Sequence, residues 1–241
     1  MRFGLDAERI ERLLGRQDLQ PPEWEPIFER LAAPTGLTQN RSTFGRRDVL
    51  QALCETAGRG ATVNDLERAA DSFLHTSSVV RLIAASDRKT DALYSTAELL
   101  ETERLALSTA LALRKAGRGL AADHVVTAAL AARPHLSDEQ RVMVERLTQD
   151  GDGVTVVVGA AGTGKTTALA AAREAWEAAG LPVRGCAVAR KAAHKLRRTA
   201  DIEATSVAAL LRRSQTFEPG TILVIDEASM LGTRAFAELV T

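Results

Sequence analysis

The segment that most constrains the fold is a glycine-rich stretch lying between an apolar run and a helix-forming run. Residues 154–158 read Val-Thr-Val-Val-Val, the β-branched composition of a buried parallel strand. The next eight residues, 159–166, match the pattern G-x-x-x-x-G-K-[ST]. Helix-forming residues then continue from Thr167 to Glu177. The pattern predicts a strand, a tight loop and a helix in direct succession.

A loop of this kind is suited to binding phosphate. Its glycines let the backbone turn tightly so that several N–H groups point inward, and the helix N-terminus adds its positive end. Lys165 would place a point charge on the β- and γ-phosphates, and Thr166 would offer a hydroxyl to Mg²⁺. We therefore expect ATP and Mg²⁺ as ligands. The candidate nucleotide-binding residues are Gly159, Ala160, Ala161, Gly162, Thr163, Gly164, Lys165, Thr166 and Thr167.

A second apolar run, residues 222–225, ends in two carboxylates, Asp226 and Glu227. Ligands of open α/β sheets gather at the carboxyl ends of the strands. Asp226 is therefore the candidate on the metal side, and Glu227 is the candidate that orients or deprotonates an attacking water. Together with Lys165 they form the predicted catalytic set. The alternative is that the two carboxylates only cap the helix that follows.

The rest of the chain divides by pattern into three segments: 1–36 with weak helical patterns, 37–135 mostly helical, and 136–241 alternating strand and helix. The alternation predicts an α/β fold with a parallel sheet. Earlier patterns predict helices over residues 24–31 and 63–74, a helix capped by Ser42 or Thr43, and one short strand at 79–83. A further helix is expected after a capping box at 95–98, and a short one within 119–135.

The composition of the chain indicates where the protein is located in the cell, but it does not indicate its function. Lys+Arg and Asp+Glu both total 31, so the net charge is zero and any nucleic-acid surface must be local. The start of the chain lacks a secretory signal and no apolar run reaches the length of a membrane span. We expect a cytoplasmic protein without a membrane partner. Cys54 and Cys186 are expected to be reduced, buried and small.

Several stretches resemble a known family. The acidic motif, residues 226–230 (Asp-Glu-Ala-Ser-Met), resembles that of RecD-like superfamily 1 DNA helicases. Residues 36–49, 95–103 and 136–140 resemble the middle of conjugative relaxase-helicases of the MobF type, the TrwC and TraA group. The resemblance covers most of the chain from about residue 36 and is strongest over 136–234. It implies a partial RecA-like P-loop NTPase domain of the AAA family, which in the complete protein acts on single-stranded DNA.

The resemblance also implies roles for further residues. Gln140 would read the adenine edge, although Ser137 and Gln140 equally fit a helix capping box. Residues 190–196 occupy the place of a strand-binding motif, with Lys191 departing from the usual glycine. The alternative for residues 190–196 is a solvated helix face. Thr205 and Ser206 resemble the next strand-contacting motif, and their alternative role is capping of a helix N-terminus. The candidate DNA-contacting residues are Arg190, Lys191, Lys195 and Thr205.

Other parts of the family pattern are missing from this sequence. The chain has one tyrosine, Tyr94, and four scattered histidines, so we do not expect DNA nicking. A second RecA-like domain, whose arginine finger is worth about 10³ to 10⁵ in rate, is not in the sequence. We therefore expect ATP binding with weak turnover, and a chain carrying that domain is a possible partner. The competing interpretations are a P-loop small-molecule kinase and an inactive remnant of a truncated gene.

Overall fold

The computed structural model describes residues 21–57, 60–83, 92–160, 162–212 and 217–240. The weak helical pattern before residue 20 and the loop residue Ala161 lie outside this range. The chain forms two compact units, residues 1–101 and 102–241, which are treated separately below. The boundary falls within helix α5 (Ala97–Ala112).

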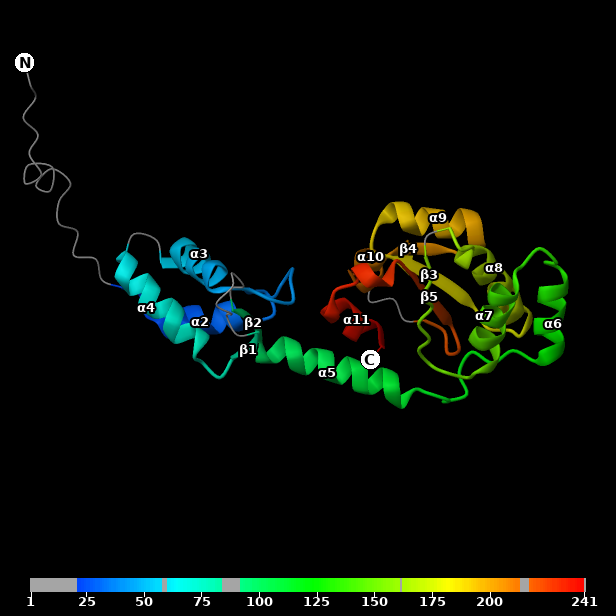
Figure 1. Cartoon of the computed structure of the whole chain (residues 1–241), viewed down its shortest axis with the longest axis horizontal. Helices are drawn as coiled ribbons and strands as arrows, with labels where there is room; N and C mark the ends of the chain where they lie inside the picture. Colours follow the sequence, from blue (N-terminus) through cyan, green and yellow to red (C-terminus); the bar gives the residue numbers. More distant parts are fainter. Residues whose placement is uncertain (1–20, 58–59, 84–91, 161, 213–216, 241) are drawn as a thin grey trace, which may run out of the picture. The chain divides into compact units, whose positions relative to one another are not determined.

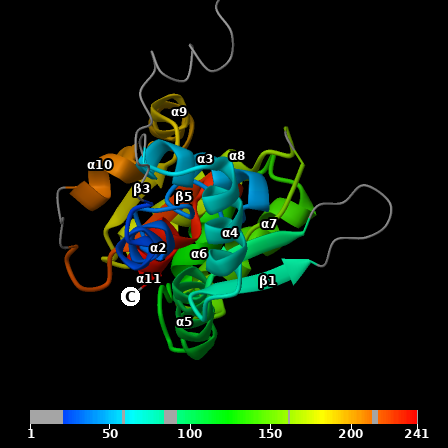
Figure 2. The same cartoon turned by 90° about the vertical axis from the view of Figure 1, so that its left-hand side faces the viewer.

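The first unit combines helices with one antiparallel pair of strands. Its elements are α2 (Trp24–Ala32), α3 (Arg46–Ala57), α4 (Val63–Leu74), β1 (Val79–Ile83) and β2 (Leu93–Thr96). α3 packs against α4, and α4 contacts β1 (Figure 2). The core is aromatic: Phe44 and Phe73 are fully buried with ring centroids 6.3 Å apart, and Phe28 contacts Phe73. The predicted elements at 24–31, 63–74 and 79–83 are confirmed.

Two predicted helix starts in this unit were wrong by a few residues. α3 begins at Arg46, because the chain before it pairs with β2: Phe44 and Tyr94 exchange backbone hydrogen bonds of 2.9 Å, and the Ser95 hydroxyl donates to the carbonyl of Ser42. Ser42 and Thr43 therefore lie before the N-terminus of α3 and do not occupy its N-cap position. In α5, Thr96 rather than Ser95 accepts from the backbone N–H of Leu99. Strand β2 was not among the predicted elements, and its pairing shifts both boundaries.

The second unit has the α/β organisation that the sequence predicts (Figure 1). Helices α6 (Asp123–Ala131) and α7 (Asp138–Gln149) precede α8 (Lys165–Ala178). Then come β3 (Val183–Ala187), α9 (Arg190–Ala200), β4 (Ala204–Ser206), α10 (Val207–Arg212), β5 (Ile222–Asp226), the 3₁₀ turn η1 (Ala228–Met230) and α11 (Thr233–Val240). The three strands are parallel in the order β4-β3-β5.

The two faces of this sheet pack against different hydrophobic cores, because successive side chains of a strand point to opposite faces. Val224 packs with α8 and α9, whereas its neighbours Leu223 and Ile225 pack with α10 and α11. This is the period of two expected of a strand buried on both faces. Cys186 lies in the second core, where burial raises the pKa of its thiol to about 11. Cys54 is exposed on α3, so the expectation that both cysteines are buried was wrong for Cys54.

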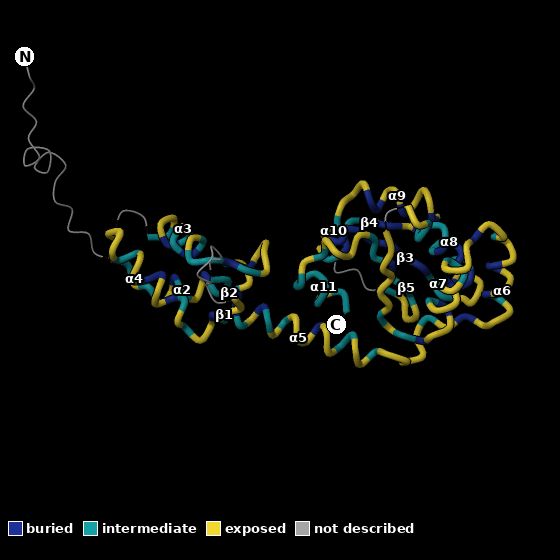
Figure 3. Tube along the Cα trace, viewed as in Figure 1, coloured by how far each residue is buried: buried dark blue, intermediate teal, exposed yellow. Residues whose placement is uncertain are grey.

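The expected strand at residues 154–158 is not formed. The segment pairs with no other strand in the described parts of the chain, and most of it is exposed, with Val158 91% accessible (Figure 3). It borders a pocket of about 450 Å³ beside α7. A β-branched run becomes a strand only when another strand supplies backbone partners. Among the described strands, β5 pairs on one side only, with β3.

Among the described residues, no helix combines the length and the apolar character needed to cross a membrane.

Candidate nucleotide-binding site

The glycine-rich loop leads directly into the N-terminus of α8. Gly162 and Gly164 both have left-handed backbone, with φ of 82° and 76°. Gly164 is the N-cap residue, and its carbonyl accepts from the N–H groups of Thr167 and Ala168 at 2.9 and 3.1 Å. The first turn of α8 contains no acidic residue. The positive end of the helix dipole is therefore available to an anion.

The ammonium group of Lys165 lies over this loop. Its Nζ donates to the carbonyls of Gly159 and Ala160 at 2.6 and 2.9 Å, and the Thr163 hydroxyl also donates to Ala160 at 2.9 Å. A positive charge is thus held beside the backbone amides that a phosphate would approach.

Gln140 also contacts the loop. The capping box at the start of α7 is confirmed: the Ser137 hydroxyl accepts from the N–H of Gln140, and the Gln140 side chain accepts from the N–H of Ser137. The Gln140 amide nitrogen then donates to the carbonyl of Thr163 at 2.9 Å. In the structure this glutamine therefore joins α7 to the loop.

The parallel sheet brings the other predicted residues to one edge. Asp226 ends β5 in register with Ala187 at the end of β3, and Arg190 starts α9 three residues later. Thr205 pairs with Cys186 in the neighbouring β4. Only four residues separate the end of α8 from the start of β3, a connection of the length common between a helix and the strand that follows it in α/β units.

Glu227 follows β5 in an unusual conformation. Its φ is 54°, its side chain is exposed, and its N–H donates to Asp226 Oδ1 at 3.0 Å. Left-handed backbone at a residue with a side chain costs about 1 to 2 kcal/mol, and such strain is frequent at functional sites. Glu227 makes no side-chain capping bond to η1, so for this residue the capping interpretation is not supported.

Helix α9 presents a basic outer face. Its buried side is made of Ala192, Ala193, Leu196 and Ala200. The exposed basic residues are Arg190, Lys191, Lys195, Arg197 and Arg198. The described residues place no carboxylate within 4 Å of these five side chains. Next to this helix, Ser206 caps α10 by accepting from the N–H of Ala209 at 3.3 Å, while Thr205 is half-buried in β4.

The donor set fits a hard divalent cation. Such ions take oxygen ligands and often bind proteins through a hydroxyl or one or two carboxylates, with phosphate oxygens completing the shell. The hydroxyl of Thr166 makes no hydrogen bond to the described residues, and neither does the second oxygen of Asp226. Both side chains are half-buried. Within the described chain there is no cluster of three His, Cys, Asp or Glu side chains that would hold a metal by itself.

Two contacts that carry no sequence motif fix α8 in place. The indole N–H of Trp176 donates to the carbonyl of Gly119 at 2.8 Å. Arg133, after α6, binds Glu174 on α8 through two short parallel hydrogen bonds. The hydrogen-bonded Arg133 guanidinium holds the pKa of the Glu174 carboxyl below its usual value. Only the three-dimensional structure reveals these pairs, since their partners are 57 and 41 residues apart.

We expect the contribution of the Arg133–Glu174 ion pair to the free energy of unfolding to be lost in acid. Because the folded pKa of Glu174 is lowered, its contribution is present above the unfolded value of about 4.3 and is lost as the pH falls through the folded value. The Glu174 side chain is 39% exposed, so we expect Glu174→Gln to cost at most about 1 kcal/mol at pH 7. Urea unfolding at pH 7, 5, 4 and 3 should show this difference shrinking below pH 4. The exposed Glu145→Gln on α7 is the matched control, and an equal loss in both variants would contradict the assignment.

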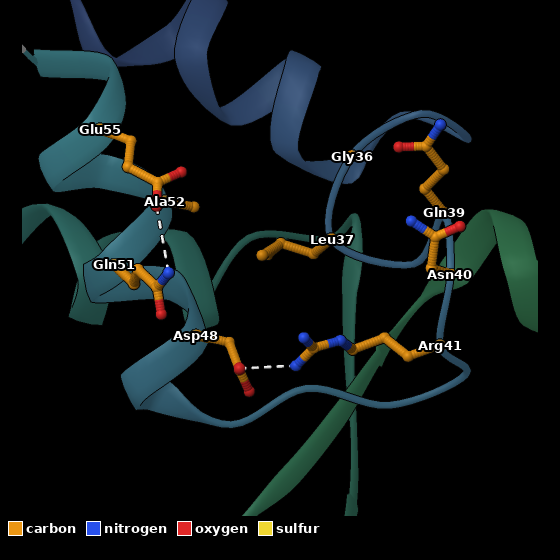
Figure 4. Close-up of a pocket in the computed structure, with 9 residues that line it drawn as sticks. All are labelled: Gly36, Leu37, Gln39, Asn40, Arg41, Asp48, Gln51, Ala52 and Glu55. Carbon is orange, nitrogen blue, oxygen red and sulfur yellow. Dashed lines mark hydrogen bonds and ion pairs between the residues drawn. The ribbon is translucent and has the colours of Figure 1, made fainter.

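The first unit contains a separate shallow pocket of about 210 Å³ (Figure 4). Its polar groups already bind each other: Arg41 pairs with Asp48 at 2.6 Å, and the Gln51 amide donates to Glu55 at 3.1 Å. Leu37 and Ala52 supply its apolar lining. None of the predicted site residues lies there.

Comparison with known proteins agrees with this geometry. Residues 135–241 match the family model described as an AAA domain. The chain is 34% identical over 211 residues to a probable conjugal transfer protein TraA of Sinorhizobium fredii, covering 83% of this chain and 19% of that protein. A conjugal transfer protein TraA of Rhizobium radiobacter is 32% identical over 214 residues, covering 85% and 19%. The ATP-dependent RecD2 DNA helicase of Deinococcus radiodurans is 36% identical over 109 residues, covering 42% and 15%.

The parallel sheet, the glycine-rich loop and the AAA-domain match place residues 135–241 in the class of AAA-type P-loop domains, and a helicase is among the proteins similar to this chain. Within that class, the chain is similar to part of the conjugal transfer proteins TraA and, over a shorter stretch, to the RecD2 DNA helicase. It spans 19% of the length of the TraA relatives that it matches.

Proposed function

We propose that residues 136–241 bind Mg-ATP in the glycine-rich loop and couple its hydrolysis to movement of the complete protein on single-stranded DNA. The observation that supports this most directly is the position of the loop. It opens α8 in the same unit in which Asp226 and Glu227 stand at the carboxyl end of β5. An anion-binding helix terminus and acidic residues at one edge are what phosphoryl transfer to water requires.

The proposed roles follow from the donor types. The loop amides from Gly159 to Thr167 and the Lys165 ammonium bind the phosphates. Thr166 and Asp226 would hold a Mg²⁺ ion bound with the nucleotide, which would supply positive charge to neutralise the phosphates. Glu227 orients the attacking water and accepts its proton. The exposed position of Glu227 leaves its carboxylate accessible for this role.

For DNA, we propose that the strand passes over the outer face of α9. Arg190, Lys191 and Lys195 would contact backbone phosphates, and Thr205 would add a contact from β4. Binding of this type is electrostatic and largely independent of base sequence. The charge is local, in keeping with a net charge of zero for the whole chain.

The test combines ATP and DNA binding. We expect Mg-ATP hydrolysis to rise when single-stranded DNA is added. The double variant Lys191→Ala/Lys195→Ala should weaken DNA binding and lower the slope of log K against log salt by about 0.7 for each lost phosphate contact. Fluorescence anisotropy of a labelled oligonucleotide from 50 to 200 mM salt measures both.

The matched control removes two positive charges elsewhere in the same unit. Arg114 and Arg118 are exposed, and Arg114→Ala/Arg118→Ala should leave the salt slope near that of the wild type. If both double variants lose affinity equally, the DNA path over α9 is wrong. ATP binding that does not respond to DNA would limit the proposal to a nucleotide-binding domain.

A further inference from the structure

The side-chain amide of Gln140 is bonded at both ends by the protein itself. Its Oε1 accepts from the backbone N–H of Ser137 at 3.1 Å, and its Nε2 donates to the carbonyl of Thr163 at 2.9 Å. One side chain thus ties the first turn of α7 to a loop peptide 23 residues away. In this arrangement both ends of the amide are bonded within the protein, so that one N–H of Nε2 and one lone pair of Oε1 remain for any other ligand.

The loop is also packed tightly against this glutamine. A Cβ atom at Gly164 would lie 2.1 Å from Gln140 Nε2, and the φ of Gly164 is 76°. Gly164 is therefore required both for its left-handed backbone and for the close approach of Gln140. The peptide between Thr163 and Gly164 is thus held on one side by Gln140, which bonds its carbonyl and lies close to Gly164.

That peptide determines where the phosphate-binding amides point. Gly164 is the N-cap of α8, so its orientation sets the direction of the N–H groups of Lys165 and Thr166. We propose that Gln140 is a positioning residue of the phosphate loop, which holds the loop amides in place for the triphosphate of any nucleotide. This inference rests on the proposed binding of nucleotide to the loop.

The two roles of Gln140 make different predictions for different ligands. A residue that reads adenine affects ATP but neither GTP nor a bare phosphate chain. A residue that positions the loop affects all three alike, because all three bind through the same amides. The probes are therefore Mg-ATP, Mg-GTP and inorganic tripolyphosphate with Mg²⁺, each titrated by calorimetry into the full chain.

Two variants separate the loop contact from the helix cap. Gln140→Met removes both the donor to Thr163 and the acceptor of the capping box without adding charge. Ser137→Ala weakens the same capping box but keeps the Gln140–Thr163 hydrogen bond. We expect Gln140→Met to weaken all three ligands by a similar factor, about threefold to tenfold for one hydrogen bond. Ser137→Ala should change the affinity for each ligand by less than about twofold, because the hydrogen bond from Gln140 to Thr163 survives in this variant.

A fall in ATP affinity alone, with GTP and tripolyphosphate unchanged, would overturn the inference and restore adenine reading. Hydrogen exchange of the ligand-free protein provides an independent measurement. The amides of residues 162–166 should exchange faster in Gln140→Met than in Ser137→Ala. Equal exchange in the two variants would also overturn the inference. Failure of the wild type to bind any of the three ligands would instead refute the proposed function, and the exchange comparison would still decide the role of Gln140.

Discussion

Replacing Lys165 with alanine is expected to lower the affinity for Mg-ATP by about 10- to 100-fold. A hydrogen bond to a charged group contributes about 1.5 to 3 kcal/mol, and Lys165 is the cation held over the loop. The same substitution removes the contacts of its Nζ with the carbonyls of Gly159 and Ala160. Isothermal titration calorimetry with Mg-ATP measures the effect, and hydrolysis should fall with it.

The control for this prediction is Arg146→Ala, which removes an exposed positive charge from α7. It should leave the dissociation constant within about twofold of the wild type, as expected for an exposed surface charge away from the loop. Circular dichroism shows whether either variant unfolds. If Lys165→Ala binds Mg-ATP as tightly as Arg146→Ala does, the loop is not the phosphate site and the proposed function falls.

The largest expected effect on stability comes from Trp176→Ala. Trp176 is 4% exposed on α8, packs among the alanines of that helix and donates its indole N–H to Gly119. Replacing a buried tryptophan with alanine typically costs about 3 to 5 kcal/mol. Urea unfolding of the second unit, followed by far-ultraviolet circular dichroism, should show this loss.

The matched variant Trp176→Phe keeps an aromatic ring and removes the N–H donor. We expect it to cost about 1 to 2 kcal/mol, for the hydrogen bond and the reduced volume. Because α8 carries the phosphate loop at its N-terminus, Trp176→Ala should also weaken Mg-ATP binding. A loss below 1 kcal/mol for Trp176→Ala would mean that the helix is held mainly by its alanine packing and by the Arg133–Glu174 pair.

The local parts of the fold were predictable because their signals lie within a few residues. The loop pattern at 159–166, the helix behind it, the capping box at Ser137 and the strand ending at Asp226 each depend on neighbours in sequence. Boundaries failed where a distant segment intervened, as at Arg46, where pairing of Phe44 with Tyr94 takes the residues that were expected to cap α3. The exposed Cys54 shows the same dependence, since helical position alone does not tell which face is covered.

The amino-acid sequence by itself determined which residue types form the candidate site. They are a glycine-rich loop with a lysine and a threonine, and a carboxylate pair after an apolar strand. Tertiary structure alone decided the strand order β4-β3-β5, the Arg133–Glu174 pair and the hydrogen bond from Gln140 to Thr163. It also left residues 154–158 outside the sheet. The physical reason is that a sequence pattern specifies which groups require partners, whereas chain topology specifies which partners come within reach.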